Sequence, residues 1–424
     1  MNKLAVLLLA AAASPSASAF VLNEPNHAAR FPSAVVTTTF AAKPPSPHGS
    51  LFSSKAAESV GAEQSQEESG LLPEYEAALQ KAVGLVKATL DDKPQLVPAL
   101  EHFCKEYITA SQASFEATKD DASKPDAAFQ RIVEGLQYGF KFGMGPDKFI
   151  FDVTHDALRG NPETEDGNTL DFYKWGCEFF RPMMDIERSV VNGMDNLKQA
   201  AEQVKNGENV VFLANHQSEA DPQVVSTLLE KAGFPDEAEK VYFVAGHKVT
   251  TDALAIPFSM GRNLICIHSK KHIDADPDKK PIKNRQNLAA MNGMLNKLKA
   301  GGCILWVAPS GGRDRRDVES GKTPIAPFDT KTVDMFRLMG KKCKQPTHYY
   351  PMATVSYELC PPPDFIEAGV GEQRNFRFVP VGLTVGDEIV EADKAKFSEL
   401  AYQRTLEEYS TLRGELFPGT EPEL

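Results

Sequence analysis

Short apolar runs alternate with amphipathic segments through the last two thirds of this chain, and this alternation limits the fold more than any other feature. Six runs have the length and apolar character of buried strands: residues 209–214, 241–245, 263–267, 303–308, 350–355 and 376–385. Helical periodicity predicts helices between and after them, at residues 193–205, 222–232, 283–299, 332–338 and 393–412. Such alternation favours an α/β fold with a mixed, mostly parallel sheet flanked by helices.

The residues before this region have a different pattern. Between residues 72 and 147, apolar side chains recur at spacings of three and four, which predicts a small helical bundle. We therefore expect a helical domain at residues 72–147, followed by a larger α/β domain at residues 148–424. A chain of 424 residues is long enough to form both.

The first seventy residues have the composition of a targeting sequence. Lys3 precedes an apolar run at residues 4–13, and small residues lead to Ala19, so we predict a signal peptide at residues 1–19. Residues 20–50 are rich in Ala, Ser, Thr and Pro and poor in acids, which predicts a transit peptide that continues into a linker up to residue 70. This order resembles the bipartite presequence of plastids with extra membranes, as in diatoms and related algae. Secretion is the alternative, which the absence of a disulfide pattern among the six cysteines disfavours.

Charge is unevenly distributed along the chain. The net charge of −12 argues against a general nucleic-acid binder. Residues 262–316 nevertheless contain 12 Lys and Arg against 4 Asp, a local charge of +8. An anionic substrate would explain this concentration, and a solvated basic helix face accounts for part of it. We find no zinc signature, and past residue 19 no apolar run long enough for a transmembrane helix.

A histidine and an aspartate lie close together in sequence, directly after the run 209–214. His216 follows that run, and Asp221 precedes a helical segment, which predicts that Asp221 caps the helix. The two side chains can meet across one loop, and a carboxylate that fixes the tautomer of an imidazole makes it a general base. No serine or cysteine elbow is evident, so we expect the nucleophile to be a hydroxyl of the substrate. A structural histidine is the alternative.

Two cationic loops follow two further predicted strands. Lys271 follows the third run, while Arg313 and Arg315 follow the fourth run and two glycines. Glycines let a backbone approach a ligand closely, and guanidinium groups fit phosphate oxygens. The simpler alternative makes Lys271 a surface residue and Arg313 a partner of Asp314 or Asp317. Because both loops are expected beside His216, we favour phosphate binding.

Four segments carry these residues in a fixed order: NHQSEADP at 215–222, PFSMGRNLIC at 257–266, SKKH at 269–272 and WVAPSGGRDR at 306–315. In this order they closely resemble the soluble plastid glycerol-3-phosphate acyltransferases. The likeness extends from about residue 72 to the C-terminal helix and is strongest between residues 210 and 329. It implies the same architecture, a small helical bundle on an α/β domain.

The resemblance also implies roles for these residues. His216 would be the base and Asp221 its partner. Glycerol 3-phosphate would be bound by a Lys-His pair and two arginines: Lys271, His272, Arg313 and Arg315. The implied reaction transfers an acyl group from acyl carrier protein, or from acyl-CoA, to the sn-1 hydroxyl of glycerol 3-phosphate. It is the first step of phosphatidate synthesis in the plastid stroma and needs no metal or bound cofactor.

Two other functions fit the same residues. One is a lysophosphatidate acyltransferase that acts at the sn-2 position on a membrane. The other is a non-catalytic protein that binds phosphate or lipid through the cationic loops. As a further hypothesis, the basic residues between 279 and 285 would form a docking patch for acyl carrier protein.

Overall fold

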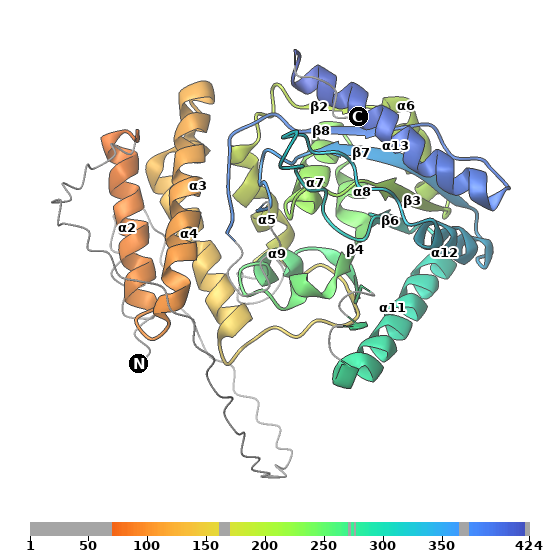
Figure 1. Ribbon diagram of the computed structural model, residues 1–424, viewed down its shortest axis with the longest axis horizontal. Coiled ribbons are helices and arrows are strands. Elements are labelled where there is room, and N and C mark those ends of the chain that lie inside the picture. The colour runs from red at the N-terminus through yellow and green to blue at the C-terminus, as the bar shows by residue number, and fades with distance from the viewer. Residues whose placement is uncertain (1–69, 161–169, 270–272, 275–276, 364–372, 420–424) are drawn as a thin grey trace, which may run out of the picture. The chain divides into compact units, whose positions relative to one another are not determined.

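The computed structural model describes residues 70–160, 170–269, 273–274, 277–363 and 373–419 (Figure 1). The predicted signal and transit peptides, as well as Lys271 and His272, therefore lie outside the described residues. Residues Leu71–Leu424 cluster into one compact unit.

The centre of this unit is a sheet of eight strands within the described residues, in the order β1-β5-β4-β6-β3-β7-β8-β2. From β5 to β7 the neighbouring strands are all parallel, whereas β1 and β8 pair antiparallel with β5 and β7. The predicted mixed, mostly parallel sheet is confirmed. The strands are β1 (Thr154–His155), β2 (Val190–Asn192), β3 (Asn209–Ala214), β4 (Val241–Gly246), β5 (Asn263–Ile267), β6 (Ile304–Val307), β7 (Thr347–Val355) and β8 (Gly382–Val385).

Helices precede the sheet and cover both of its faces (Figure 1). Three come first in the chain: α2 (Pro73–Thr89), α3 (Val97–Thr118) and α4 (Pro125–Tyr138). The later ones are α5 (Phe172–Phe180), α6 (Met194–Lys205), α7 (Asp221–Lys231), α8 (Pro235–Lys240), α9 (Ile256–Met260), α11 (Lys280–Ala300), α12 (Thr330–Lys341) and α13 (Lys394–Leu416). None of the helices in this described part of the chain combines the length and apolar composition of a membrane span.

The central strands are mostly apolar on both sides because both faces of the sheet are covered. In β3, Val210, Phe212 and Ala214 join the cluster that contains the side chains of α2 to α7. Val211 and Leu213 join the opposite cluster, which is formed with α11, α12 and α13. This double burial explains why the parallel strands are continuous apolar runs in the sequence.

The N-terminal helices share one hydrophobic cluster with the sheet. An aromatic group makes the connection: the rings of Tyr107 in α3 and Phe179 in α5 are 4.8 Å apart, and Phe376 lies 5.4 Å from Tyr107. The Tyr107 hydroxyl also donates a hydrogen bond of 2.7 Å to the carbonyl of Phe179. The helical region is present as expected, while the domain boundary at residue 147 stays a prediction.

Several short elements do not follow from the sequence. Strands β1 and β2 contain two and three residues, too few to show a periodicity. The run 376–385 is a strand only at Gly382–Val385, and before it Val379 forms an isolated bridge with Met184.

We expect Gly193→Ala to destabilise the fold strongly. Gly193 lies between β2 and α6 with a φ of +75°, and a Cβ there would lie 1.9 Å from the carbonyl oxygen of Val385. Gly207→Ala is the matched control, since Gly207 also has a positive φ, of +83°, but nothing lies within 4 Å of its added Cβ. Urea unfolding should show a further loss of about 1–3 kcal/mol for the first variant. Equal losses would contradict this close approach.

Candidate active site

Five loops meet at one edge of the sheet. The strands β5, β4, β6, β3 and β7 are parallel, so their carboxyl ends lie at the same edge, where ligands bind in α/β folds. His216 follows β3, while Arg313 and Arg315 follow β6. The two loops are in contact, because the Asp314 amide donates a hydrogen bond of 2.5 Å to the His216 carbonyl.

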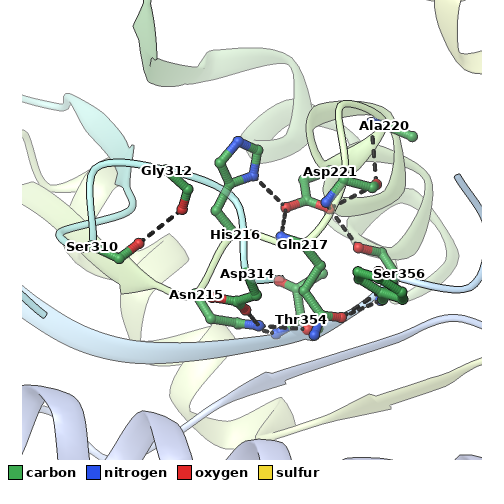
Figure 2. A network of polar contacts seen from close by, with 12 residues as sticks. Asn215, His216, Gln217, Ala220, Asp221, Ser310, Gly312, Asp314, Thr354 and Ser356 are labelled. Atoms are coloured by element: carbon green, nitrogen blue, oxygen red, sulfur yellow. Dashed lines mark hydrogen bonds and ion pairs between the residues drawn. The ribbon is translucent and has the colours of Figure 1, made fainter. Parts of the chain in front are cut away.

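His216 and Asp221 form the pair that their spacing predicts (Figure 2). His216 Nδ1 lies 2.8 Å from Asp221 Oδ2. The Asp221 side chain is fully buried, whereas the His216 side chain is 26% exposed. A carboxylate in this place accepts a hydrogen bond from the protonated Nδ1. The other ring nitrogen, Nε2, is then the one that can take a proton from a ligand.

The Asp221 carboxylate is fixed by further donors from the loop. The amides of Gln217 and Ser218 lie 2.8 and 3.1 Å from its oxygens, and the hydroxyls of Ser218 and Ser356 also donate to it. Burial raises the pKa of Asp221, but the hydrogen bonds, chiefly that from His216, outweigh burial and hold the pKa below its usual range. Asp221 is therefore charged at neutral pH and stabilises a protonated imidazole.

The prediction that Asp221 caps helix α7 is wrong. The cap position is Ala220, and Asp221 is the first residue of the helix. Its carboxylate accepts the amides of the preceding loop instead, because it must point back toward His216 to make their contact.

The residues on either side of His216 hold the loop against β7. Asn215 and Gln217 are fully buried. The side-chain amide of Asn215 makes two hydrogen bonds to the Thr354 backbone, of 2.8 and 2.9 Å. The side-chain oxygen of Gln217 accepts a hydrogen bond of 2.9 Å from the backbone amide of Ser356. With both neighbours turned inward, His216 is left facing the edge of the sheet. Its ring also packs edge-on against Trp306 of β6, with 5.6 Å between ring centroids.

Sequence reasoning missed a second buried acid in this site. Asp314 lies between the two predicted phosphate-binding arginines and is 0% exposed. Its carboxylate accepts the Ala326 amide at 2.9 Å and the Asn215 side-chain amide at 3.4 Å. Burial raises the pKa of Asp314 to about 7, and the nearby charge of Asp221 acts in the same direction.

A buried ion-pair group supports the same loop from the other side. Arg374 contacts Glu219, at 2.5 Å, and Asp252, at 3.0 Å. Burial lowers the pKa of Arg374, but the two carboxylates outweigh burial, so the guanidinium stays charged. No sequence signal marks this group, since its members are 33 and 122 residues apart along the chain.

A mostly apolar hollow adjoins this ion-pair group. It is partly open to solvent, and Asp252 and Arg374 form its polar end. Its other walls come mainly from α3, from residues 139–144 after α4, and from the segment before α9: Leu100, Phe103, Phe140 and Leu254. The ion pair of Glu219 and Arg374 therefore connects the loop of His216 to this apolar hollow.

Three of the cysteine thiols in the described part of the chain are poor nucleophiles at neutral pH, and no metal site is found there. Burial raises the pKa of the Cys104, Cys266 and Cys303 thiols to about 12. No group of three or more His, Cys, Asp or Glu in this part of the chain is arranged to hold a metal ion.

Comparisons with known proteins show which proteins this chain resembles. A model named acyltransferase matches residues 189–357, which include both loops. A chloroplastic glycerol-3-phosphate acyltransferase of Arabidopsis thaliana is 36% identical over 319 residues, 73% of this chain and 65% of the relative. Those of Spinacia oleracea and Pisum sativum are 36% identical over 278 residues, 63% of this chain and 57% and 59% of the relatives.

The chain thus spans less than two thirds of the length of these relatives. The resemblance in the motifs is confirmed over most of this chain, and the matched region contains His216, Asp221, Arg313 and Arg315. Residues 189–357 therefore match the acyltransferase family model, and this chain is similar over most of its length to the chloroplastic glycerol-3-phosphate acyltransferases.

Proposed function

We propose that this protein transfers an acyl group from a thioester to the sn-1 hydroxyl of glycerol 3-phosphate, giving 1-acyl-glycerol 3-phosphate. One observation carries the proposal: the His216–Asp221 pair lies at the carboxyl edge of the sheet, in contact with the loop of Arg313 and Arg315. The names of the homologous proteins support the choice of substrate.

In the proposed mechanism, His216 is the general base. The substrate hydroxyl attacks the thioester carbonyl, and its proton passes to His216 Nε2. The tetrahedral intermediate then collapses, the carbon–sulfur bond breaks, and the thiolate takes the proton from His216. Asp221 keeps the proton on Nδ1 and stabilises the imidazolium. Proton transfer of this kind contributes about 10²–10⁴-fold, and holding both substrates together supplies the rest through proximity.

Arg313 and Arg315 are proposed to bind the phosphate, together with Lys271 and His272. Both arginines are partly buried beside the buried Asp314, and Arg315 Nη1 donates to the Pro363 carbonyl at 2.8 Å. Planar guanidinium groups held in this way suit phosphate oxygens.

The acyl chain would occupy the apolar hollow beside Arg374. The donor would be acyl carrier protein or acyl-CoA. The relatives are named chloroplastic, which supports a plastid location, and the stroma and a bipartite presequence remain part of the proposal.

The direct test offers the purified protein two acceptors and four donors. The acceptors are glycerol 3-phosphate and 1-acyl-glycerol 3-phosphate, and the donors are oleoyl and palmitoyl thioesters of acyl carrier protein and of CoA. We expect acylation of glycerol 3-phosphate at sn-1. Turnover of only the second acceptor would favour an sn-2 acyltransferase, and binding of glycerol 3-phosphate without turnover would favour a binding protein.

We expect His216→Ala to lower kcat by about 10²–10⁴-fold with little change in the KM for glycerol 3-phosphate, because only the base is lost. His348→Ala is the matched control. His348 is also held by carboxylates, Glu388 at 2.7 Å and Glu208 at 2.9 Å, but it lies near the amino end of β7, at the opposite edge of the sheet. The measurement is the steady-state kcat and KM of both variants. Similar losses of kcat in the two variants would contradict the role of His216 as the general base.

We expect Arg313→Ala to raise the KM for glycerol 3-phosphate at least tenfold, since a hydrogen bond to a charged group contributes about 1.5–3 kcal/mol. The KM for the thioester should stay unchanged. Arg316→Ala is the control, because Arg316 is exposed in the same loop. A rise in KM of the same size in both variants would show only a general loss of positive charge.

A further inference from the structure

Asp314 is a buried acid in a loop whose neighbouring side chains are partly exposed. The residues on either side of it, Arg313 and Arg315, are partly exposed, whereas Asp314 is 0% exposed. Burial, together with the nearby charge of the fully buried Asp221, raises the pKa of its carboxyl to about 7. A buried acid beside a second buried acid costs stability that an apolar side chain would avoid.

The contacts of Asp314 connect the two functional loops (Figure 2). Its amide donates to the carbonyl of His216, and its Oδ2 accepts from the side-chain amide of Asn215 at 3.4 Å. Asn215 is itself fixed to the Thr354 backbone of β7 by two hydrogen bonds. A side chain at 314 is therefore tied to the residue directly before the base.

The other carboxylate oxygen fixes the far end of the arginine loop. Asp314 Oδ1 accepts the Ala326 amide at 2.9 Å, which draws the chain twelve residues further on back to the same point. The segment that carries Arg313 and Arg315 is thus held at its centre by one carboxylate with partners on both sides.

We propose that Asp314 is a positioning residue that sets the distance between the phosphate held by the arginine loop and the proton acceptor of His216. This inference rests on the proposed function. In this role the carboxylate would act through its protein partners, Asn215 and Ala326, and not by binding the substrate. It acts by keeping the loops of residues 215–217 and 313–315 in register, and a misplacement of about 1 Å at an acceptor can cost 10²-fold in rate.

The test compares Asp314→Ala and Asp314→Asn with Asp317→Ala. Asp317 is an exposed aspartate of the same loop that accepts hydrogen bonds from Ser320, outside the network of His216. For Asp314→Ala we expect a tenfold or larger rise in the KM for glycerol 3-phosphate and a tenfold or larger fall in kcat, with an unchanged KM for the thioester. Asp314→Asn keeps the shape and one acceptor oxygen for the Ala326 amide, so its losses should be smaller.

A purely structural role would give a different pattern. Loss of folded protein alone lowers the apparent kcat in proportion and leaves both KM values unchanged, so this result, or unchanged kinetics in Asp314→Ala, would overturn the proposal. Equal effects in Asp317→Ala would also overturn it.

Binding separates this proposal from the proposed function. Glycerol 3-phosphate is titrated calorimetrically into wild type and the three variants. If wild type binds glycerol 3-phosphate but has no turnover, the proposed function fails. A tenfold higher Kd in Asp314→Ala, with an unchanged Kd in Asp317→Ala, would then still support the proposal that Asp314 positions the loop that binds the phosphate. Equal Kd values in wild type and Asp314→Ala would overturn that role, and so would a wild type that binds no glycerol 3-phosphate.

Discussion

The buried carboxylate of Asp221 is the interaction on which the rest of the site depends. It has no exposed surface, and it accepts hydrogen bonds from the His216 ring nitrogen, from two loop amides and from two serine hydroxyls. These donors hold its pKa low against the effect of burial, so the aspartate remains charged. A charged acceptor of fixed direction determines the tautomer of His216 and stabilises the imidazolium that proton transfer would create.

The parallel sheet supplies the second requirement, which is convergence. Parallel strands end at the same edge of the sheet, so loops that are far apart in sequence lie close together there. The side chains of Asn215 and Gln217 attach the histidine loop to Thr354 in β7 and to Ser356 directly after it. Asp314 attaches the arginine loop to the histidine loop. The chain also places a histidine between two carboxylates at His348, near the other edge. Position in the fold therefore distinguishes the proposed base from a structural ion pair.

Much of the fold follows from the sequence because doubly buried strands leave an unmistakable apolar run. The runs at 209–214 and 263–267 agree with β3 and β5 at both ends, whereas the short β1 and β2 leave no signal. The His216–Asp221 pair was predictable because it closes within five residues. Ser356 and Arg374 were not, since they reach the loop from 135 and 155 residues away. Asp314 was identified only as a possible partner of Arg313, because nothing in a Gly-Gly-Arg-Asp-Arg segment indicates which side chain turns inward. The roles of Lys271 and His272 stay predictions.

The central claim is that the substrate hydroxyl, activated by His216, is the nucleophile, with no acyl-enzyme intermediate. It is tested most directly by rapid-mixing measurement of the thiol released from an acyl thioester, with and without glycerol 3-phosphate. The account predicts that thiol appears only when glycerol 3-phosphate is present, in amounts equal to the acylated product. A stoichiometric burst of thiol without the acceptor would reveal an acylated side chain and contradict direct transfer.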